Sequence, residues 1–146
     1  MQPLIYIGLA FFMGIVLAVY LPMNGAVARH LGSAVSANLT FFVVAFLTAI
    51  VTFALFGSLE TLRQIGDVPP YLFLTGLIGS LIVLGATTLV PELGARRFFI
   101  LLVSGQIVMA VVVSHYGWLS SPQDPITVRK VFGAVLVFSG AIITTG

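Results

Sequence analysis

The stretch LVSGQIVMAV, residues 102–111, places a single glutamine, Gln106, inside a run that otherwise avoids water. The run continues from Phe98 to Gln123 without an Asp, Glu, Lys or Arg. The whole chain shares this character, since 60% of its 146 residues are hydrophobic and only 7% are charged. A soluble domain carries roughly 25% charged residues. The composition therefore indicates an integral membrane protein.

The charged residues fall into four clusters that divide the chain into five apolar segments. The clusters are Arg29; Glu60, Arg63 and Asp67; Glu92, Arg96 and Arg97; and Asp124, Arg129 and Lys130. A bilayer core needs about 20 apolar residues of helix, and continuous apolar runs exclude the alternating strands of a membrane barrel. We predict an all-α integral membrane protein with one membrane domain, residues 1–146. Its five expected transmembrane helices are residues 4–29, 34–57, 70–90, 98–117 and 126–145.

Polar residues at the segment ends predict how these helices begin. Ser33 and Ser58 are expected N-caps, and Asp124 is the expected N-cap of the last helix, with Pro125 in its first turn. The stretch SLETLRQIG, residues 58–66, fits a short interfacial helix and a solvated loop equally well.

Basic residues give no preferred orientation in the membrane. With five spans, Arg63, Arg129 and Lys130 lie on one side, and Arg29, Arg96 and Arg97 lie on the other. Cytoplasmic loops normally carry the excess of Lys and Arg, so a balance of three against three predicts insertion both ways. This dual topology would allow an antiparallel homodimer, an inverted repeat made from one chain. The alternative is that lipid effects, or a weaker contribution of Arg29 because of its depth, select one orientation.

Several polar side chains are expected at one level of the bilayer, in the half where the first helix ends. Asn24, Asn38, Gln106, Thr87 and Thr88 belong to this set. Amides and hydroxyls in hydrocarbon need partners, so these groups should face the bundle interior or a wet cavity. Two interpretations remain open for them, interhelical hydrogen bonding and the lining of a substrate pathway.

Pro22 and Gly25 are the expected kink of the first helix. Pro22 lacks the N–H of a regular helix, and Gly25 adds backbone freedom close by. A helix that ended at Leu21 would leave Asn24 in a loop, whereas a helix that continues to Arg29 places Asn24 inside the membrane. The apolar character of residues 23–28 favours the second reading.

The sequence offers no catalytic constellation. It has no cysteine, and none of the predicted spans carries a central Asp or Glu. No phosphate-binding glycine loop, metal-ligand cluster or nucleophile with a base is apparent. The high pI reflects scarce acidic residues instead of a basic surface for nucleic acid. We therefore expect no enzyme activity, no cofactor, no metal and no nucleic-acid partner.

Five motifs in order resemble the YdcZ-type family of the drug/metabolite transporter superfamily. They are NGAVARHLGSAVSANLTFF (residues 24–42), TGLIGSLIV (75–83), VPELGA (90–95), SGQIV (104–108) and HYGWL (115–119). The resemblance implies a five-helix half-transporter of the bacterial inner membrane that pairs antiparallel, with Asn24 and Gly105 with Gln106 as the marked polar positions. The chain departs from the family at Ser114, where an acidic residue is common, and at Ala45, where glycine is common.

These observations together favour a dual-topology transporter of an unknown small molecule, whose partners are a second copy and the lipid bilayer. Asn24 and Gln106 would line or shape its pathway, and rocking of two subunits would exchange access. A passive pore is the second interpretation, because no acid for ion coupling is present. A non-transporting membrane scaffold or accessory subunit is the third.

Overall fold

The structure is a computed structural model that describes residues 4–145. Those residues form six α-helices and three short 3-10 helices. The α-helices are α1 (Leu4–Leu31), α2 (Ala34–Phe56), α3 (Leu59–Arg63), α4 (Leu74–Leu93), α5 (Ala95–Tyr116) and α6 (Val128–Thr145). The 3-10 helices are η1 (Gln64–Asp67), η2 (Pro70–Phe73) and η3 (Trp118–Ser120). The all-α prediction is confirmed for the part of the chain that the structure describes.

Four helices are long and apolar enough to cross a membrane. They are Leu4–Leu31, Ala34–Phe56, Pro70–Leu93 (η2 with α4) and Ala95–Tyr116. Each coincides with a predicted span to within a few residues, because the charge clusters that interrupt the apolar runs lie at or near the helix ends. A helix, α6, also occupies the fifth predicted segment.

The first helix continues through its proline. α1 runs without interruption from Leu4 to Leu31, with Pro22 inside it. Asn24 therefore lies within the helix, as the continued reading of this segment requires. The predicted kink at Pro22 and Gly25 remains a prediction.

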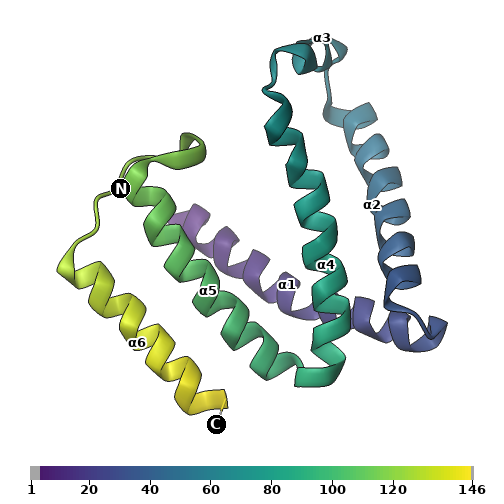
Figure 1. Cartoon of the computed structure of the whole chain (residues 1–146). Helices are drawn as coiled ribbons and strands as arrows, with labels where there is room; N and C mark the ends of the chain where they lie inside the picture. Colours follow the sequence, from purple (N-terminus) through teal and green to yellow (C-terminus); the bar gives the residue numbers. More distant parts are fainter. Residues whose placement is uncertain (1–3, 146) are drawn as a thin grey trace. The chain divides into compact units, whose positions relative to one another are not determined.

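The chain divides into two compact units, and the first ends at Glu92. In this unit α2 and α4 lie side by side, connected through α3 (Figure 1). The buried positions of α1 are Leu21, Asn24, Gly25 and Ala28, whose spacing places them on one helical face. The buried positions of α4 follow the same spacing and are Val83, Ala86, Thr87 and Val90. These two stripes and Ala37 of α2 form the small core of the first unit.

The second unit, from Leu93 onward, is the hairpin of α5 and α6 (Figure 1). Its two helices pack against each other, and Phe98 and Ser104 of α5 and Ala141 of α6 are buried. The Arg96 guanidinium Nη1 donates to the carbonyl oxygen of Thr144 at 3.0 Å, which joins the start of α5 to the end of α6.

Helix starts follow the predicted caps at two of three positions. The Ser33 hydroxyl accepts from the Ser36 N–H at 3.2 Å, and the Ser58 hydroxyl accepts from the Glu60 N–H at 3.2 Å. The stretch after Ser58 is helical, which decides between the two readings of residues 58–66 in favour of the helix.

The predicted N-cap at Asp124 is wrong. α6 begins at Val128, and the capping position belongs to Thr127, whose hydroxyl accepts from the Lys130 N–H at 3.4 Å. Asp124 instead forms an ion pair with the Lys130 ammonium group. Its own N–H donates to the carbonyl oxygen of Ser114 at 2.8 Å. This bond holds the linker between α5 and α6, residues 117–127, against the end of α5.

Apolar side chains dominate the exposed surface of the helices. In α1, Leu4 is 83% exposed and Phe11 is 74% exposed. In water such a surface would drive aggregation, whereas in a bilayer lipid tails solvate it. The burial pattern thus agrees with the composition in placing these helices in a membrane.

Candidate functional site

The best-connected polar pair joins α1 to α4. The Asn24 side-chain Nδ2 donates to the Thr87 hydroxyl oxygen at 2.6 Å. Both residues are buried, with Asn24 7% exposed and Thr87 1% exposed. Two of the polar positions expected to meet are therefore in direct contact, although they lie 63 residues apart in the sequence.

The Thr87 hydroxyl fixes which way the Asn24 amide faces. This hydroxyl has one proton, which it donates to the carbonyl oxygen of Val83 at 2.7 Å. It can therefore only accept from Asn24, so the NH₂ group of the amide must point at Thr87. The amide oxygen, Oδ1, is left free to accept. Among the described residues it has no hydrogen-bond partner, and it is not among the fully enclosed unpaired atoms.

A close approach of two helices accompanies this pair. A Cβ built on Gly25 would lie 3.4 Å from Cγ of Pro91 and 3.8 Å from the carbonyl oxygen of Thr87. Gly25 is thus a contact point between α1 and α4, a role that its sequence neighbourhood did not reveal.

Asn38 bonds to Ser80, a residue outside the set of polar side chains expected at one level. Its Nδ2 donates to the Ser80 hydroxyl at 3.2 Å, which joins α2 to α4. Ser80 and Thr87 lie seven residues, or about two turns, apart on α4. The same face of α4 therefore accepts hydrogen bonds from the side-chain amides of Asn38 and Asn24. The Oδ1 atom of Asn38 is buried without a hydrogen-bond partner among the described residues.

Thr88 stands apart from this arrangement. It is exposed, and its hydroxyl donates to the carbonyl oxygen of Leu84 in its own helix at 2.9 Å. The neighbouring threonines of α4 therefore have different surroundings, because successive helix positions differ by about 100° in direction.

Gly105 and Gln106 belong to the second unit, and both are exposed on α5. Their neighbour Ser104 is buried and donates to the carbonyl oxygen of Ile100 at 2.7 Å. Within the described residues the Gln106 side chain makes no hydrogen bond. Gln106 thus lies on a face of α5 that α6 does not cover.

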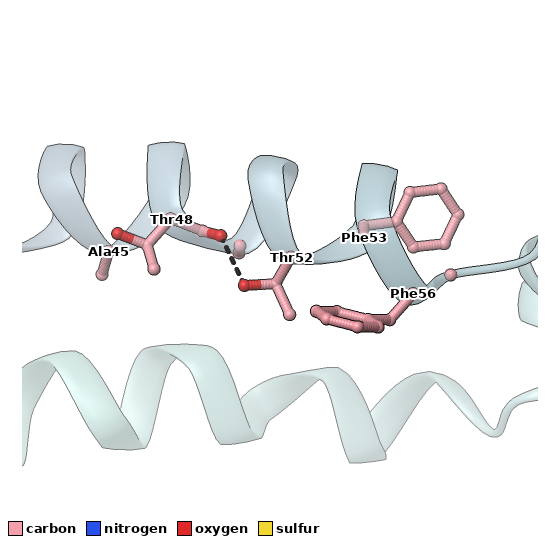
Figure 2. A pocket seen from close by; sticks show the side chains of 7 residues that line it. Ala45, Thr48, Thr52, Phe53 and Phe56 are labelled. Carbon is pink, nitrogen blue, oxygen red and sulfur yellow. Dashed lines mark hydrogen bonds between the residues drawn. The ribbon is translucent and has the colours of Figure 1, made fainter.

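Two grooves open on the helices of the first unit. The first, the α1/α2 groove, has a volume of about 540 Å³ and is lined by Tyr20, Asn24, Val27, Thr40, Phe41 and Val44, among others. The second, of about 670 Å³, runs along α2 past Ala45, Thr48, Thr52 and Phe56, which Figure 2 shows on one side of the helix. The Thr52 hydroxyl donates to the carbonyl oxygen of Thr48 at 2.8 Å, so the α2 threonines are bound to their own helix.

Charge is missing from both grooves. No residue that lines either one is an acid, a base or a histidine. Among the described residues no group of three or more His, Cys, Asp or Glu is placed to hold a metal ion. The chemistry that these surfaces can perform is hydrogen bonding and apolar contact.

The sequence does not reveal the partners of several residues that shape this site. The spacing of Gly76 and Ser80 predicts close helix packing at Ser80 but not its hydrogen bond to Asn38, and no pattern indicates the contact between Pro91 and Gly25. Tyr20 and Phe41 form a stacked pair with ring centroids 5.8 Å apart across α1 and α2. Their position just before Asn24 and after Asn38 was the available signal, since aromatic residues beside a polar position inside a span often form pocket walls.

The comparisons with known proteins give one family. The family model described as "Putative inner membrane exporter, YdcZ" matches residues 5–143, nearly the whole chain. No curated protein and no solved structure matches the chain.

Proposed function

The chain belongs to the YdcZ inner membrane exporter family, and from this membership we propose that it carries small molecules across the membrane as a homodimer of two oppositely oriented copies. It is a multi-pass protein of the inner membrane, with at least four apolar helices of spanning length. The resemblance noted from its motifs is confirmed by the family match, which covers all of them.

The balance of basic residues is the observation that carries the proposal. Arg63, which follows α2, and Arg129 and Lys130, which follow α5, lie on one side, called here the Arg63 side. Arg29 at the end of α1, and Arg96 and Arg97 at the start of α5, lie on the other, the Arg97 side. This count needs only the four spans, because Arg129 and Lys130 lie in the first turn of α6. Three basic residues on each side leave the positive-inside rule without a preference.

A fifth span completes the proposed subunit. α6 has 18 residues, or about 27 Å of helix, and carries its charges only at its start. Arg129 and Lys130 can extend their charged ends to the interface while their stems stay among apolar groups. An odd number of spans places the two ends of the chain on opposite sides.

The uncovered glutamine of α5 supports a further helix packed on that face. A side-chain amide in lipid leaves two donors and an oxygen without partners, which membrane helices avoid. We propose that Gln106 meets polar groups of another helix in the assembled dimer. Asn24, Thr87 and Asn38 would then shape the pathway from the first unit.

Cross-linking between copies tests the proposed arrangement. The chain has no cysteine, so one copy can carry Leu31→Cys on the Arg97 side and a second, differently tagged copy can carry Gln64→Cys on the Arg63 side. Both positions are exposed. In an antiparallel dimer these two cysteines share one side of the membrane, and a short thiol cross-linker joins them. A pair of Leu31→Cys copies lies on opposite sides and is not joined.

The reverse pattern would contradict the proposal. A parallel assembly gives cross-links between identical positions and none between residue 31 of one copy and residue 64 of the other.

Flux of solutes through proteoliposomes separates the possible mechanisms. Saturable, gradient-coupled uptake supports a carrier. Non-saturable leak supports a passive pore, which needs no central acid for ion coupling. An absence of flux over a broad solute panel supports the scaffold.

A further inference from the structure

The α1/α2 groove has the size and walls of a small-molecule site. Its volume of about 540 Å³ falls within the roughly 300–1,000 Å³ of known ligand pockets. The stacked rings of Tyr20 and Phe41 and the side chains of Val27 and Val44 make most of it apolar. Both helices belong to the first unit, so the groove does not depend on the placement of the second.

Two oxygen atoms that line the groove can accept hydrogen bonds. Asn24 is more than nine-tenths buried; one of the two N–H groups of its Nδ2 bonds to Thr87, and its Oδ1 has no hydrogen-bond partner among the described residues. The Thr40 hydroxyl donates its proton to the carbonyl oxygen of Ala37 at 2.9 Å, which leaves its oxygen as an acceptor. The Tyr20 hydroxyl can donate or accept and therefore imposes no restriction.

The groove also selects against charge. None of its lining residues is ionisable except Tyr20. Burial of an ion without a counter-charge or a full set of hydrogen bonds is strongly unfavourable, and more so at the level of the hydrocarbon. A cation or an anion would find neither compensation here.

We propose that the α1/α2 groove binds uncharged, mainly apolar solutes that carry an N–H or O–H group, and that this donor bonds to Oδ1 of Asn24. The inference rests on the proposed function, because it names the class of solute that the transporter carries. A lipid acyl chain could fill the apolar part of the groove but has no donor, so it would leave Oδ1 unpaired. An apolar solute with one N–H or O–H group contacts the apolar walls and also donates a hydrogen bond to Oδ1 of Asn24.

A matched pair of probes tests the role of the donor. 5-Fluoroindole has an apolar ring body and one N–H, and its N-methyl derivative has the same body without that donor. Binding of each to the full chain in lipid nanodiscs is followed by ¹⁹F NMR, with empty nanodiscs as the blank. We expect saturable binding of 5-fluoroindole and about tenfold weaker binding of the methylated probe, as a hydrogen bond to a buried acceptor implies.

Two leucine variants assign the effect to one amide. Asn24→Leu removes the groove acceptor, and we expect both probes to bind this variant equally. Asn38→Leu is the control, since it makes the same replacement and also removes an interhelical hydrogen bond, but at a residue outside the groove. The preference for the N–H probe should persist in it. The probe comparison on the unmodified chain does not require any variant to fold.

Three results would overturn the inference. They are equal binding of both probes to the unmodified chain, no saturable binding of 5-fluoroindole, and loss of the preference in Asn38→Leu. The binding measurement needs neither transport nor a particular dimer. Antiparallel cross-links with no donor preference would therefore reject only the solute class, whereas a donor preference with parallel cross-links would reject only the proposed arrangement.

Discussion

One hydroxyl proton determines the orientation of the Asn24 amide. Thr87 donates to its own helix and accepts from Asn24, so the amide oxygen is directed away from α4. The sequence could predict that Asn24 and Thr87 lie at a similar depth in the membrane. Each lies a similar number of residues from the end of its helix, and both of these ends are on the same side of the membrane. It could not predict their contact, because a rotation of α4 by one residue would have presented Thr88 instead.

The contact between Asn24 and Thr87 should have a measurable coupling energy. Asn24→Leu and Thr87→Val are made singly and together, as a double-mutant cycle. We expect a coupling energy between about 0.6 and 1.7 kcal/mol, the average and the maximum found for hydrogen bonds between membrane helices. Unfolding in mixed micelles measures it. Thr88→Val is the control, because Thr88 bonds only to its own helix. A cost for Thr88→Val equal to that of Thr87→Val would contradict the account.

Gly25 should tolerate only small side chains. The nearest atom of Pro91 lies 3.4 Å from the position of an added Cβ, so Gly25→Ala makes an ordinary contact while Gly25→Leu forces α1 and α4 apart. We expect Gly25→Leu to lower the free energy of unfolding by about 1–3 kcal/mol. Gly14→Leu in the same helix meets open space and should change it little. Equal effects at both glycines would show that the close approach is unimportant.

The sequence predicts which segments form helices, but it predicts the first residue of each helix less well. Continuous apolar runs fix α1, α2, α4 and α5, since lipid leaves the backbone no alternative to a helix. Asp124 was a reasonable cap by residue type, but its carboxylate binds Lys130 and the helix starts four residues later. The ion pair joins the segment before α6 to the first turn of that helix, and residue preference alone does not include such an interaction.

The linker between α5 and α6 contains a second interaction of this kind. The Ile126 N–H donates to Nδ1 of His115 at 3.1 Å. His115→Phe keeps an aromatic ring beside Tyr116 but removes this acceptor, so the Ile126 amide should exchange its hydrogen severalfold faster in an NMR exchange experiment. The Asp124 amide, which donates to the carbonyl oxygen of Ser114, is the internal reference. Unchanged exchange at Ile126, or equal acceleration at Asp124, would contradict the assigned contact.

At the scale of the whole molecule, many large apolar side chains are exposed in both compact units. The uncharged polar side chain of Gln106 is also exposed, on α5. The sequence predicted that the chain spans the membrane and that its basic residues are balanced. It could not reveal which helix covers Gln106, because that depends on an assembly and not on the pattern of one segment.

Because three basic residues lie on each side of the membrane, the loss of one should change the orientation of the chain. Arg129→Gln removes one charge from the Arg63 side, and Arg97→Gln removes one from the Arg97 side; neither arginine makes a hydrogen bond or ion pair among the described residues. The side that keeps three basic residues should then prefer the cytoplasm, so the two variants should shift the orientation in opposite directions. A reporter fused to residue 146 measures the ratio. A shift in the same direction for both would contradict the role of the charge count.

The most direct test of dual topology is the accessibility of one cysteine in intact cells. Gln64→Cys supplies an exposed thiol on the Arg63 side in a chain that otherwise has none. A membrane-impermeant maleimide is applied before and after permeabilisation, and the labelled fractions are compared. Our account predicts that about half of the protein reacts from outside. Labelling of essentially all copies from one side of the membrane would contradict it.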